Sequence, residues 1–259
     1  MTHYLSGEIF RTSRRNYLYI ALAICAAVLL GVVALFAYAN STVEDPNGRM
    51  HLDMLLMFFV NSLPSIGLYF TLLVGDMTFS EEYKIQTMRN TIFYGTPRIT
   101  VFLGKFANCL LYCFLVMVVL LAVAFGLGAL LLGGFGAAFG ECFSAFSMML
   151  AGAIPLWIAG AALSTALFCN ISSPNLVLFS FVGIFILPTN FLKLINWLLD
   201  IPAVGTLRSL LITSRLDELA KGAATDDPMF LVTCWVTGLV FTAAFLILGY
   251  IGFSRKEIK

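Results

Sequence analysis

Charged residues are scarce in this chain. Asp, Glu, Lys and Arg make up 11% of the 259 residues, and the apolar set makes up 60%. An average soluble domain has roughly 25% charged and roughly 45–50% apolar residues. The composition therefore excludes an ordinary water-soluble domain and indicates an integral membrane protein.

Histidine is almost absent, and the motifs of intramembrane enzymes are missing. His3 and His51 are the only two histidines, and both lie outside the long apolar runs. No HExxH or GxSxG sequence occurs, and these motifs carry the metal and serine chemistry of many hydrolases. Glu81 and Glu82 resemble the start of the EExxxR motif of one membrane protease family, but Gln86 occupies the arginine position. We expect no catalytic residues and no metal site.

The chain also lacks a nucleotide cradle. A GxxxxGK[ST] loop holds phosphate groups with backbone N–H groups and the start of a helix. Here Gly104 and Lys105 are followed by Phe106, and no glycine stands at the required upstream position. ATP-driven work by this chain would need ATP and magnesium bound to a separate subunit, with no cofactor bound directly.

Ionisable groups are nearly absent from the apolar runs. Asp76 and Glu141 lie only at their rims, whereas charged groups inside a span usually mark a proton or ion path. This pattern disfavours proton coupling and suits an amphipathic or hydrophobic cargo. Two alternatives to ATP-driven transport remain. The chain could be an ATP-independent channel or carrier, or an intramembrane enzyme.

Long apolar runs are what the sequence has in abundance. A bilayer core requires about 20 mostly apolar residues in a helix, and six runs of that length are present. Residues 133–140 and 170–175 are predicted turns between neighbouring runs. The sequence predicts an all-α protein with one transmembrane domain, whose spans are Tyr17–Ala39, Met54–Gly75, Phe106–Leu132, Cys142–Phe168, Leu176–Trp197 and Met229–Phe253.

The basic residues predict the orientation. With both termini in the cytoplasm, ten of the fifteen Lys and Arg residues fall on the inner side, and nine of the fourteen acidic residues fall on the outer side. Lys and Arg concentrate in the cytoplasmic loops of membrane proteins. Six spans with both termini cytoplasmic satisfy this bias, in a multi-pass protein of a cell membrane.

Residues 1–16 predict an amphipathic helix ahead of the first span. Glu8, Arg11 and Arg15 share one helical stripe, and Leu5 and Ile9 face away from it. Such a helix would lie in the inner headgroup layer with its arginines near anionic lipid. A disordered basic segment that only enforces orientation is the alternative.

The segment between spans two and three, residues 76–105, is long, charged and amphipathic. Helical spacing places Ile85, Met88 and Ile92 on one side, with Phe93 adjacent. Gly95 would end this helix, and Thr96 would cap the next one. An apolar face projecting into the cytosol is either a docking surface for a partner or a helix that folds back on the membrane.

Two spans contain proline beside neutral polar residues. Asn61, Pro64 and Ser65 are predicted to interrupt span two, and Pro188 is predicted to interrupt span five beside Thr189 and Asn190. Broken helices often line a transport route, so Asn61, Ser65, Thr189 and Asn190 are candidate pathway-lining residues. Kinks that only shape the bundle are the alternative.

Residues 198–228 form the longest predicted outer segment. Val204 and Leu207 fall on one face of a short helix, Ser214 with Asp217 predicts a capping box, and Gly222 is expected to end a second helix. We expect these helices to rest on the outer membrane surface and to cover the bundle.

The layout resembles that of ABC-2 type permeases, the membrane subunits of ATP-binding-cassette transporters, over essentially the whole chain. The resemblance is carried by the basic amphipathic lead, the six spans and the segment FSEEYKIQTMRNTIFYGTPRITVFLGKF. In that family an acidic residue after span two precedes a coupling helix, then a proline with a basic residue, then a lysine. Glu81 or Glu82, the 86–94 segment, Pro97 with Arg98, and Lys105 match that order. Family members often carry Gly-Thr at the start of the coupling helix, where this chain has Gln86 and Thr87.

The resemblance implies a permease that dimerises with itself or a sister subunit and binds two ATPase subunits, with no nucleic acid among its partners. It implies outward movement of cargo, and the compact form of the chain is similar to members that export drugs or antimicrobial peptides and give self-immunity. The residues expected to dock the ATPase subunit are Glu81, Glu82, Ile85, Met88, Arg89, Ile92 and Phe93.

Overall fold

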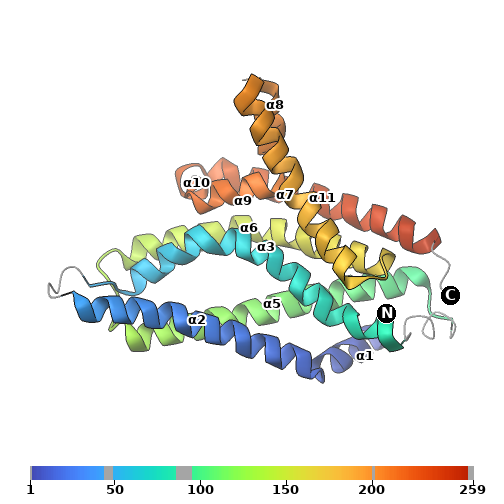
Figure 1. Cartoon of the computed structure of the whole chain (residues 1–259), viewed down its shortest axis with the longest axis horizontal. Helices are drawn as coiled ribbons and strands as arrows, with labels where there is room; N and C mark the ends of the chain where they lie inside the picture. Colours follow the sequence, from blue (N-terminus) through green and yellow to red (C-terminus); the bar gives the residue numbers. More distant parts are fainter. Residues whose placement is uncertain (1, 44–48, 86–94, 200–201, 256–259) are drawn as a thin grey trace.

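The computed structural model describes residues 2–43, 49–85, 95–199 and 202–255, and every regular element among them is a helix (Figure 1). The helices are α1 Thr2–Ser13, α2 Asn16–Thr42, α3 Leu52–Ile85, α5 Arg98–Leu131, α6 Phe139–Asn170, α7 Pro174–Leu199, α8 Pro202–Ser209, α9 Ile212–Ala220, α10 Ala223–Asp226 and α11 Pro228–Arg255.

The six predicted spans are confirmed as α2, α3, α5, α6, α7 and α11. Each of these helices is long and apolar enough to cross a membrane. The predicted span limits lie inside the observed helices to within a residue, and α5 extends eight residues ahead of its predicted start. Pro97 occupies the N-cap position of α5 and no side-chain cap forms there, so the prediction that Thr96 caps this helix was wrong.

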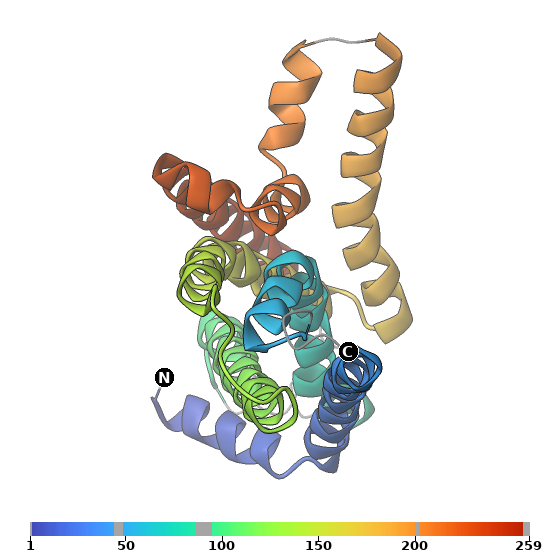
Figure 2. The same cartoon turned by 90° about the vertical axis from the view of Figure 1, so that its left-hand side faces the viewer.

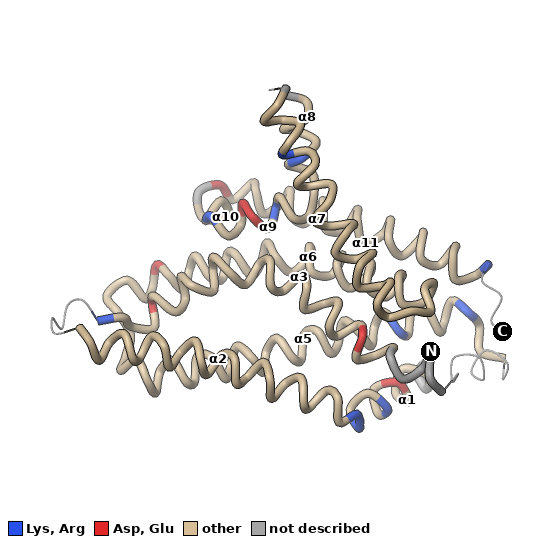
Figure 3. The backbone as a smooth tube through the Cα atoms, in the orientation of Figure 1, with Lys and Arg blue, Asp and Glu red and all other residues tan. Residues whose placement is uncertain are grey.

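The two ends of the bundle differ. The start of α1, the end of α3, the start of α5 and the end of α11 lie together, and we call this the junction end (Figure 1). The connection between α5 and α6, residues 132–138, lies at the opposite end, where Gly133 and Gly134 adopt positive φ angles of 74° and 135°. Figure 3 shows basic residues on α1, at the start of α5 and at the end of α11. Placing both termini at one end agrees with an even number of spans; which side of the membrane that end faces stays a prediction.

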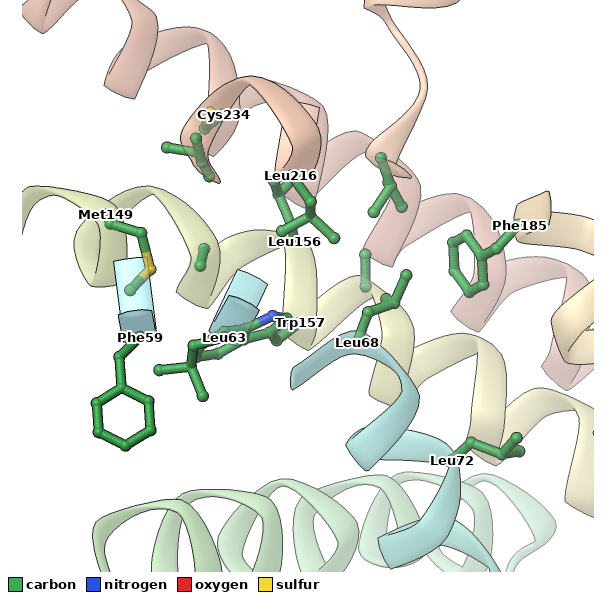
Figure 4. Packing of buried hydrophobic residues seen from close by; sticks show 14 of the residues in the cluster. Phe59, Leu63, Leu68, Leu72, Met149, Leu156, Trp157, Phe185, Leu216 and Cys234 are labelled. Atoms are coloured by element: carbon green, nitrogen blue, oxygen red, sulfur yellow. The ribbon is translucent and has the colours of Figure 1, made fainter. Parts of the chain in front are cut away.

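Helix α6 is the centre of the bundle. It packs against both α3 and α11, and two thirds of its most apolar window is buried. Its sequence from Ala159 to Ala162, together with Ser164, consists of small residues that are fully or nearly fully buried. Small residues let membrane helices approach closely, so this stretch explains why α6 and not another helix takes the central position. Figure 4 shows Leu156 and Trp157 of α6 among residues from the neighbouring helices.

Helices α2 and α7 lie at the periphery. Helix α2 packs mainly along α5, and α7 leaves the bundle and pairs with α8 (Figure 2). Large apolar side chains such as Phe179, Leu187 and Phe191 are exposed on α7. An apolar surface of this kind is expected for a helix that faces lipid or another membrane helix.

Helix α9 contributes to the core. Ile212, Leu216 and Leu219 are buried among residues of the main apolar cluster, and the helix packs along α3 and α6. The predicted capping box was wrong, because α9 begins at Ile212 and buries Ser214 in its first turn. Gly222 follows the helix with a φ of 87°, as predicted for its end. The position of this segment relative to the membrane surface stays a prediction.

Candidate functional site

The predicted docking segment falls largely outside the described residues. Glu81, Glu82 and Ile85 lie in the last turns of α3, and their side chains are not described. Met88, Arg89, Ile92, Phe93 and the helix expected over residues 86–94 lie outside the part of the chain that the structure describes. The structure does describe the helices that enter and leave this segment, and the junction end is therefore the first candidate site.

A buried ion pair joins α1 to the start of α5. The Lys105 ammonium donates to Glu8 Oε2 at 2.6 Å, and Arg11 donates to the same oxygen at 2.6 Å. The Lys105 and Glu8 side chains are only 1% and 7% exposed. One carboxylate thus pairs with two cations, and burial makes the attraction strong because water screens it little.

Hydrogen bonds continue this contact along both helices. The Asn108 amide donates to Thr12 Oγ1 at 3.0 Å, and the Tyr112 hydroxyl donates to the Ile9 carbonyl at 2.9 Å. These residues recur every three or four positions, so they form one stripe on each helix. We call the contact of Tyr4, Glu8, Ile9 and Thr12 with Gly104, Lys105, Asn108 and Tyr112 the α1–α5 seam.

Gly104 permits the close approach at the seam. A Cβ atom at this position would lie 2.6 Å from two ring carbons of Tyr4, which is much closer than van der Waals contact. The glycine of the Gly-Lys pair therefore serves helix packing, in keeping with the absence of a nucleotide cradle around it.

Helix α1 agrees only in part with its prediction. The helix is present but ends at Ser13, so Glu8 and Arg11 lie on it and Arg15 follows it. Glu8 and Arg15 are 6% exposed and contact other helices, whereas the Arg11 side chain is 32% exposed. Periodicity placed Glu8 and Arg11 on one face, but it cannot tell whether a polar face meets lipid or the polar residues of another helix. The position of α1 in the headgroup layer stays a prediction.

Two arginines connect the junction end further. Arg15 donates to the Met77 carbonyl of α3, and Arg98 donates to the Phe253 and Ser254 carbonyls. The last carbonyls of a helix lack intrahelical partners and favour a cation, which explains the position of Arg98 at the end of α11. The helix that leaves the predicted docking segment is thus bonded to both α1 and α11.

Aromatic rings extend the junction to α6. The Lys105 Nζ atom lies 5.5 Å from the centre of the Phe79 ring on α3. Phe79 in turn stacks on Phe168 of α6, with ring centres 5.4 Å apart. The cation–π contact adds stabilisation to a lysine that is removed from water.

The charges of the seam shift the pKa of Glu8. Burial raises it, but the attraction and hydrogen bonds of Lys105 and Arg11 outweigh burial, so the pKa of Glu8 lies below its ordinary value of 4.5. Burial and the nearby Glu8 carboxylate raise the pKa of Tyr4, which remains a neutral hydrogen-bonding group. The Glu8 carboxylate is therefore ionised at neutral pH.

This shift predicts an acid-sensitive stability. A lowered folded-state pKa stabilises the protein above the unfolded value, and the stabilisation is lost as the pH falls through the lowered pKa. We expect the thermal unfolding temperature to fall upon acidification below about pH 4.5, and Glu8→Gln to flatten this part of the profile. The measurement is unfolding followed by intrinsic fluorescence from pH 7 to pH 3. Glu141→Gln, at an exposed glutamate, is the control and should retain the parent profile; a Glu8→Gln profile as steep as the parent would contradict the assignment.

The second candidate site is a polar cavity of about 160 Å³ between α3, α7 and α9. Ser65, Thr189 and Asn190, three of the four predicted pathway residues, line it. Asn61 is not among its lining residues; its side chain is exposed and donates to the Met57 carbonyl at 2.9 Å. Tyr69, Thr213 and Asp217 complete the polar lining and were not among the predicted pathway residues.

Both prolines lie inside continuous helices, so the predicted interruptions were wrong. Side-chain donors reach carbonyls near each proline: Trp157 Nε1 donates to the Pro64 carbonyl at 2.9 Å, and Thr189 Oγ1 donates to the Phe185 carbonyl at 3.1 Å. These are not the carbonyls four residues ahead of each proline, which lose their N–H donor. Helix α3 is bowed along its length but unbroken (Figure 1).

Two further cavities are apolar. They measure about 330 Å³ and 270 Å³ and lie on the two sides of the contact between α3 and α5. Gly67, Phe70, Met117 and Leu121 line both. Hydrocarbon suits such walls and water does not, so of these three cavities the polar one is suited to recognise a hydrogen-bonding group. Among the described residues, no group of three or more His, Cys, Asp or Glu side chains could hold a metal ion.

Comparison with known proteins identifies the family. A family model described as ABC-2 family transporter protein matches residues 4–187, which is well over half of the chain and includes the α1–α5 seam. A search of individual curated proteins gave no significant match. The six apolar helices and this match agree with the resemblance carried by the sequence, and the chain belongs to the ABC-2 family of transporter proteins.

Proposed function

We propose that the chain is the permease subunit of an ATP-binding-cassette exporter in a bacterial plasma membrane. It moves an amphipathic or hydrophobic cargo, such as a drug or an antimicrobial peptide, outward and can thereby confer self-immunity. A separate ATPase subunit supplies the energy, because the sequence has no phosphate cradle. A second permease subunit, identical or related, completes the membrane part.

The observation that carries this proposal is the bonding of α5 at the junction end. Residues 86–97 join α3 to α5 in the chain, and the start of α5 is joined to α1 through Lys105 and to α11 through Arg98. A displacement imposed on this segment would therefore move the ends of several helices together. This arrangement suits a subunit that receives a conformational change from a partner.

The proposed route for cargo passes the polar residues of α3 and α7. Ser65, Thr189 and Asn190 share one cavity, and Asn61 lies one helical turn before Ser65 on an exposed part of α3. Neutral polar side chains on α3 and α7, beside apolar walls, are compatible with an amphipathic cargo.

The docking part of the proposal is tested by co-purification. The chain is expressed with the ATPase subunit encoded nearest to it, and Ile92→Asp with Phe93→Asp is introduced. We expect complete loss of the co-purified ATPase subunit with normal membrane insertion, because two charges replace the apolar face that enters the partner groove. Leu207→Asp with Leu210→Asp is the matched control, since both leucines are exposed, at 55% and 50%, and lie on or beside α8. A complex retained by the 92/93 variant would remove the docking hypothesis.

A further inference from the structure

The polar cavity between α3, α7 and α9 combines hydroxyl groups, an amide and one carboxylate. Its polar lining consists of Ser65 and Tyr69 from α3, Thr189 and Asn190 from α7, and Thr213 and Asp217 from α9. Figure 4 shows three apolar members of the same lining, Leu68, Phe185 and Leu216, which come from the same three helices. The cavity is therefore amphipathic, and it depends on α9 packing against the transmembrane helices.

The hydroxyl hydrogens of the two threonines in this cavity are already used within the protein. Thr189 and Thr213 are within hydrogen-bonding distance of each other, and both hydroxyls also approach the Phe185 carbonyl, at 3.1 Å and 3.4 Å. Each hydroxyl has one hydrogen to donate and two lone pairs to accept with. With their hydrogens directed at each other and at Phe185, these side chains retain mainly acceptor capacity. A ligand that donates hydrogen bonds suits them better than one that accepts.

The charge of the lining also favours a ligand that donates hydrogen bonds, provided that the ligand is a cation. Asp217 is exposed and is the carboxylate of the lining, and no Lys or Arg is among the residues that line the cavity. The nearby Arg215 is directed elsewhere, with its guanidinium 3.6 Å from Glu218 and over the Phe230 ring. The neighbouring arginine therefore does not occupy the cavity as a counter-ion. A cation that enters gains the attraction of Asp217, and an anion meets repulsion.

We propose that this cavity binds the ammonium group of an alkyl or aryl amine, with Asp217 as the charged partner and the threonine oxygens and Asn190 as acceptors. Leu68 and Ile186 contact the first carbon atoms of the ligand, and its tail extends along the apolar surface between α3 and α7. Assigning this cation to the exported cargo rests on the proposed function; binding itself does not. The cargo class is then a cationic amphiphile.

The test uses the full-length chain in lipid nanodiscs without any ATPase subunit. Binding of n-hexylammonium, n-hexanol and n-hexanoate is measured by isothermal titration calorimetry at neutral pH. We expect n-hexylammonium to bind the parent protein at least about tenfold more tightly than n-hexanol, and n-hexanoate to bind more weakly still, because a hydrogen bond to a charged group is stronger than a neutral one. Each ligand is also titrated into empty nanodiscs of the same lipids, and this heat of partitioning into lipid is subtracted.

Two matched variants separate the cavity from the general charge of α9. Asp217→Asn is expected to weaken n-hexylammonium binding about tenfold and to leave n-hexanol binding unchanged. Glu218→Gln makes the same charge change at the next residue, which is not part of the lining, and should retain the parent affinity within about twofold. Equal affinities for the amine and the alcohol, no loss in Asp217→Asn, or equal losses in both variants would each overturn the proposal. The ligand series in the parent protein decides the question even if Asp217→Asn fails to fold.

The outcome is independent of the ATPase experiment. Failure of amine binding together with retained ATPase co-purification would remove the cation site and leave the exporter proposal standing. Amine binding without an ATPase partner would leave the site standing and remove its assignment to exported cargo.

Discussion

Glu8→Leu is expected to lower the free energy of unfolding by about 3–5 kcal/mol, because it removes the carboxylate from a buried lysine. Lys105 is 1% exposed and lies 2.6 Å from Glu8. Loss of one member of a buried pair costs far more than the pair itself contributes, since the remaining charge stays out of water. The measurement is chemical unfolding in detergent micelles, followed by fluorescence.

Lys105→Met is expected to cost less than Glu8→Leu. In that variant Glu8 keeps Arg11, which donates to the same carboxylate oxygen and is itself 32% exposed on its side chain. The double variant Glu8→Leu with Lys105→Met should recover most of the lost stability, because an apolar pair of similar volume replaces the buried ions. Glu141→Gln, at an exposed glutamate, serves as the control and should stay within about 0.5 kcal/mol of the parent. A double variant as unstable as Glu8→Leu alone would show that the ion pair is not the source of the loss.

The two single variants and the double variant of Glu8 and Lys105 also test how movement is transmitted. If α5 transmits movement from the docking segment, weakening the α1–α5 seam should reduce transport by the assembled complex more than it reduces ATP hydrolysis. The double variant should restore stability without restoring the charges, so it separates the need for a folded seam from the need for a charged one.

The transmembrane architecture could be predicted because local features determine it. Span length follows from bilayer thickness, and the helix ends are marked by glycine turns and by charges, as at Gly133 and Glu141. These signals depend on residues that are close together in the chain, so a single sequence is enough to predict the spans.

The ion pair of the seam could not be predicted, because its members are separated by 97 residues. The sequence identified Glu8 as part of a polar stripe and Lys105 as the basic residue before a span, but periodicity does not pair one face with another. A lysine one residue ahead of a long apolar run was the available signal, and it was equally consistent with an interfacial position.

The lining of the polar cavity could be predicted only in part, for the same reason. Proline and neutral polar residues pointed to Ser65, Thr189 and Asn190, which the structure brings together. Asn61 shares their character but not their location, and Asp217 was assigned to a helix cap. Which residues of two helices meet depends on their crossing angle and on α9, and neither follows from local pattern.

Glycines of α6 differ in how closely they approach other helices. A Cβ atom at Gly152 or Gly160 would lie 2.7 Å from a leucine methyl group of a neighbouring helix, whereas nothing lies within 4 Å of a Cβ atom at Gly140. The tightest backbone contact, at Gly238 of α11, was not singled out, because an isolated glycine carries no pattern.

Gly238→Ala is expected to destabilise the protein by about 1–3 kcal/mol through overpacking. A Cβ atom at this position would lie 2.6 Å from both the carbonyl carbon and the carbonyl oxygen of Pro155, and 2.7 Å from the Pro155 Cβ. The obstructing atoms belong to a backbone and a proline ring inside α6, so no side-chain rotation can relieve the contact. The helix α11 must move away from α6, which is its main packing partner.

Gly31→Ala is the matched control, because it makes the same substitution within the long helix α2 at a position where nothing lies within 4 Å of the added Cβ. Alanine has the higher helix propensity, by about 1 kcal/mol in water, so this variant should be as stable as the parent or more stable. Both variants are compared by unfolding in the same micelles. Equal stability of the two would mean that α6 and α11 can separate at little cost.

A displaced α11 would also change the junction end. The Phe253 and Ser254 carbonyls at the end of this helix accept hydrogen bonds from Arg98 at the start of α5. In Gly238→Ala the shift originates well away from the junction end, yet it is carried there by a rigid helix. We therefore expect Gly238→Ala to weaken co-purification of the ATPase subunit in addition to lowering stability, whereas Arg98→Gln should weaken co-purification while retaining most of the stability. An ATPase complex of parent strength in both variants would show that the contact between α5 and α11 does not position the docking segment.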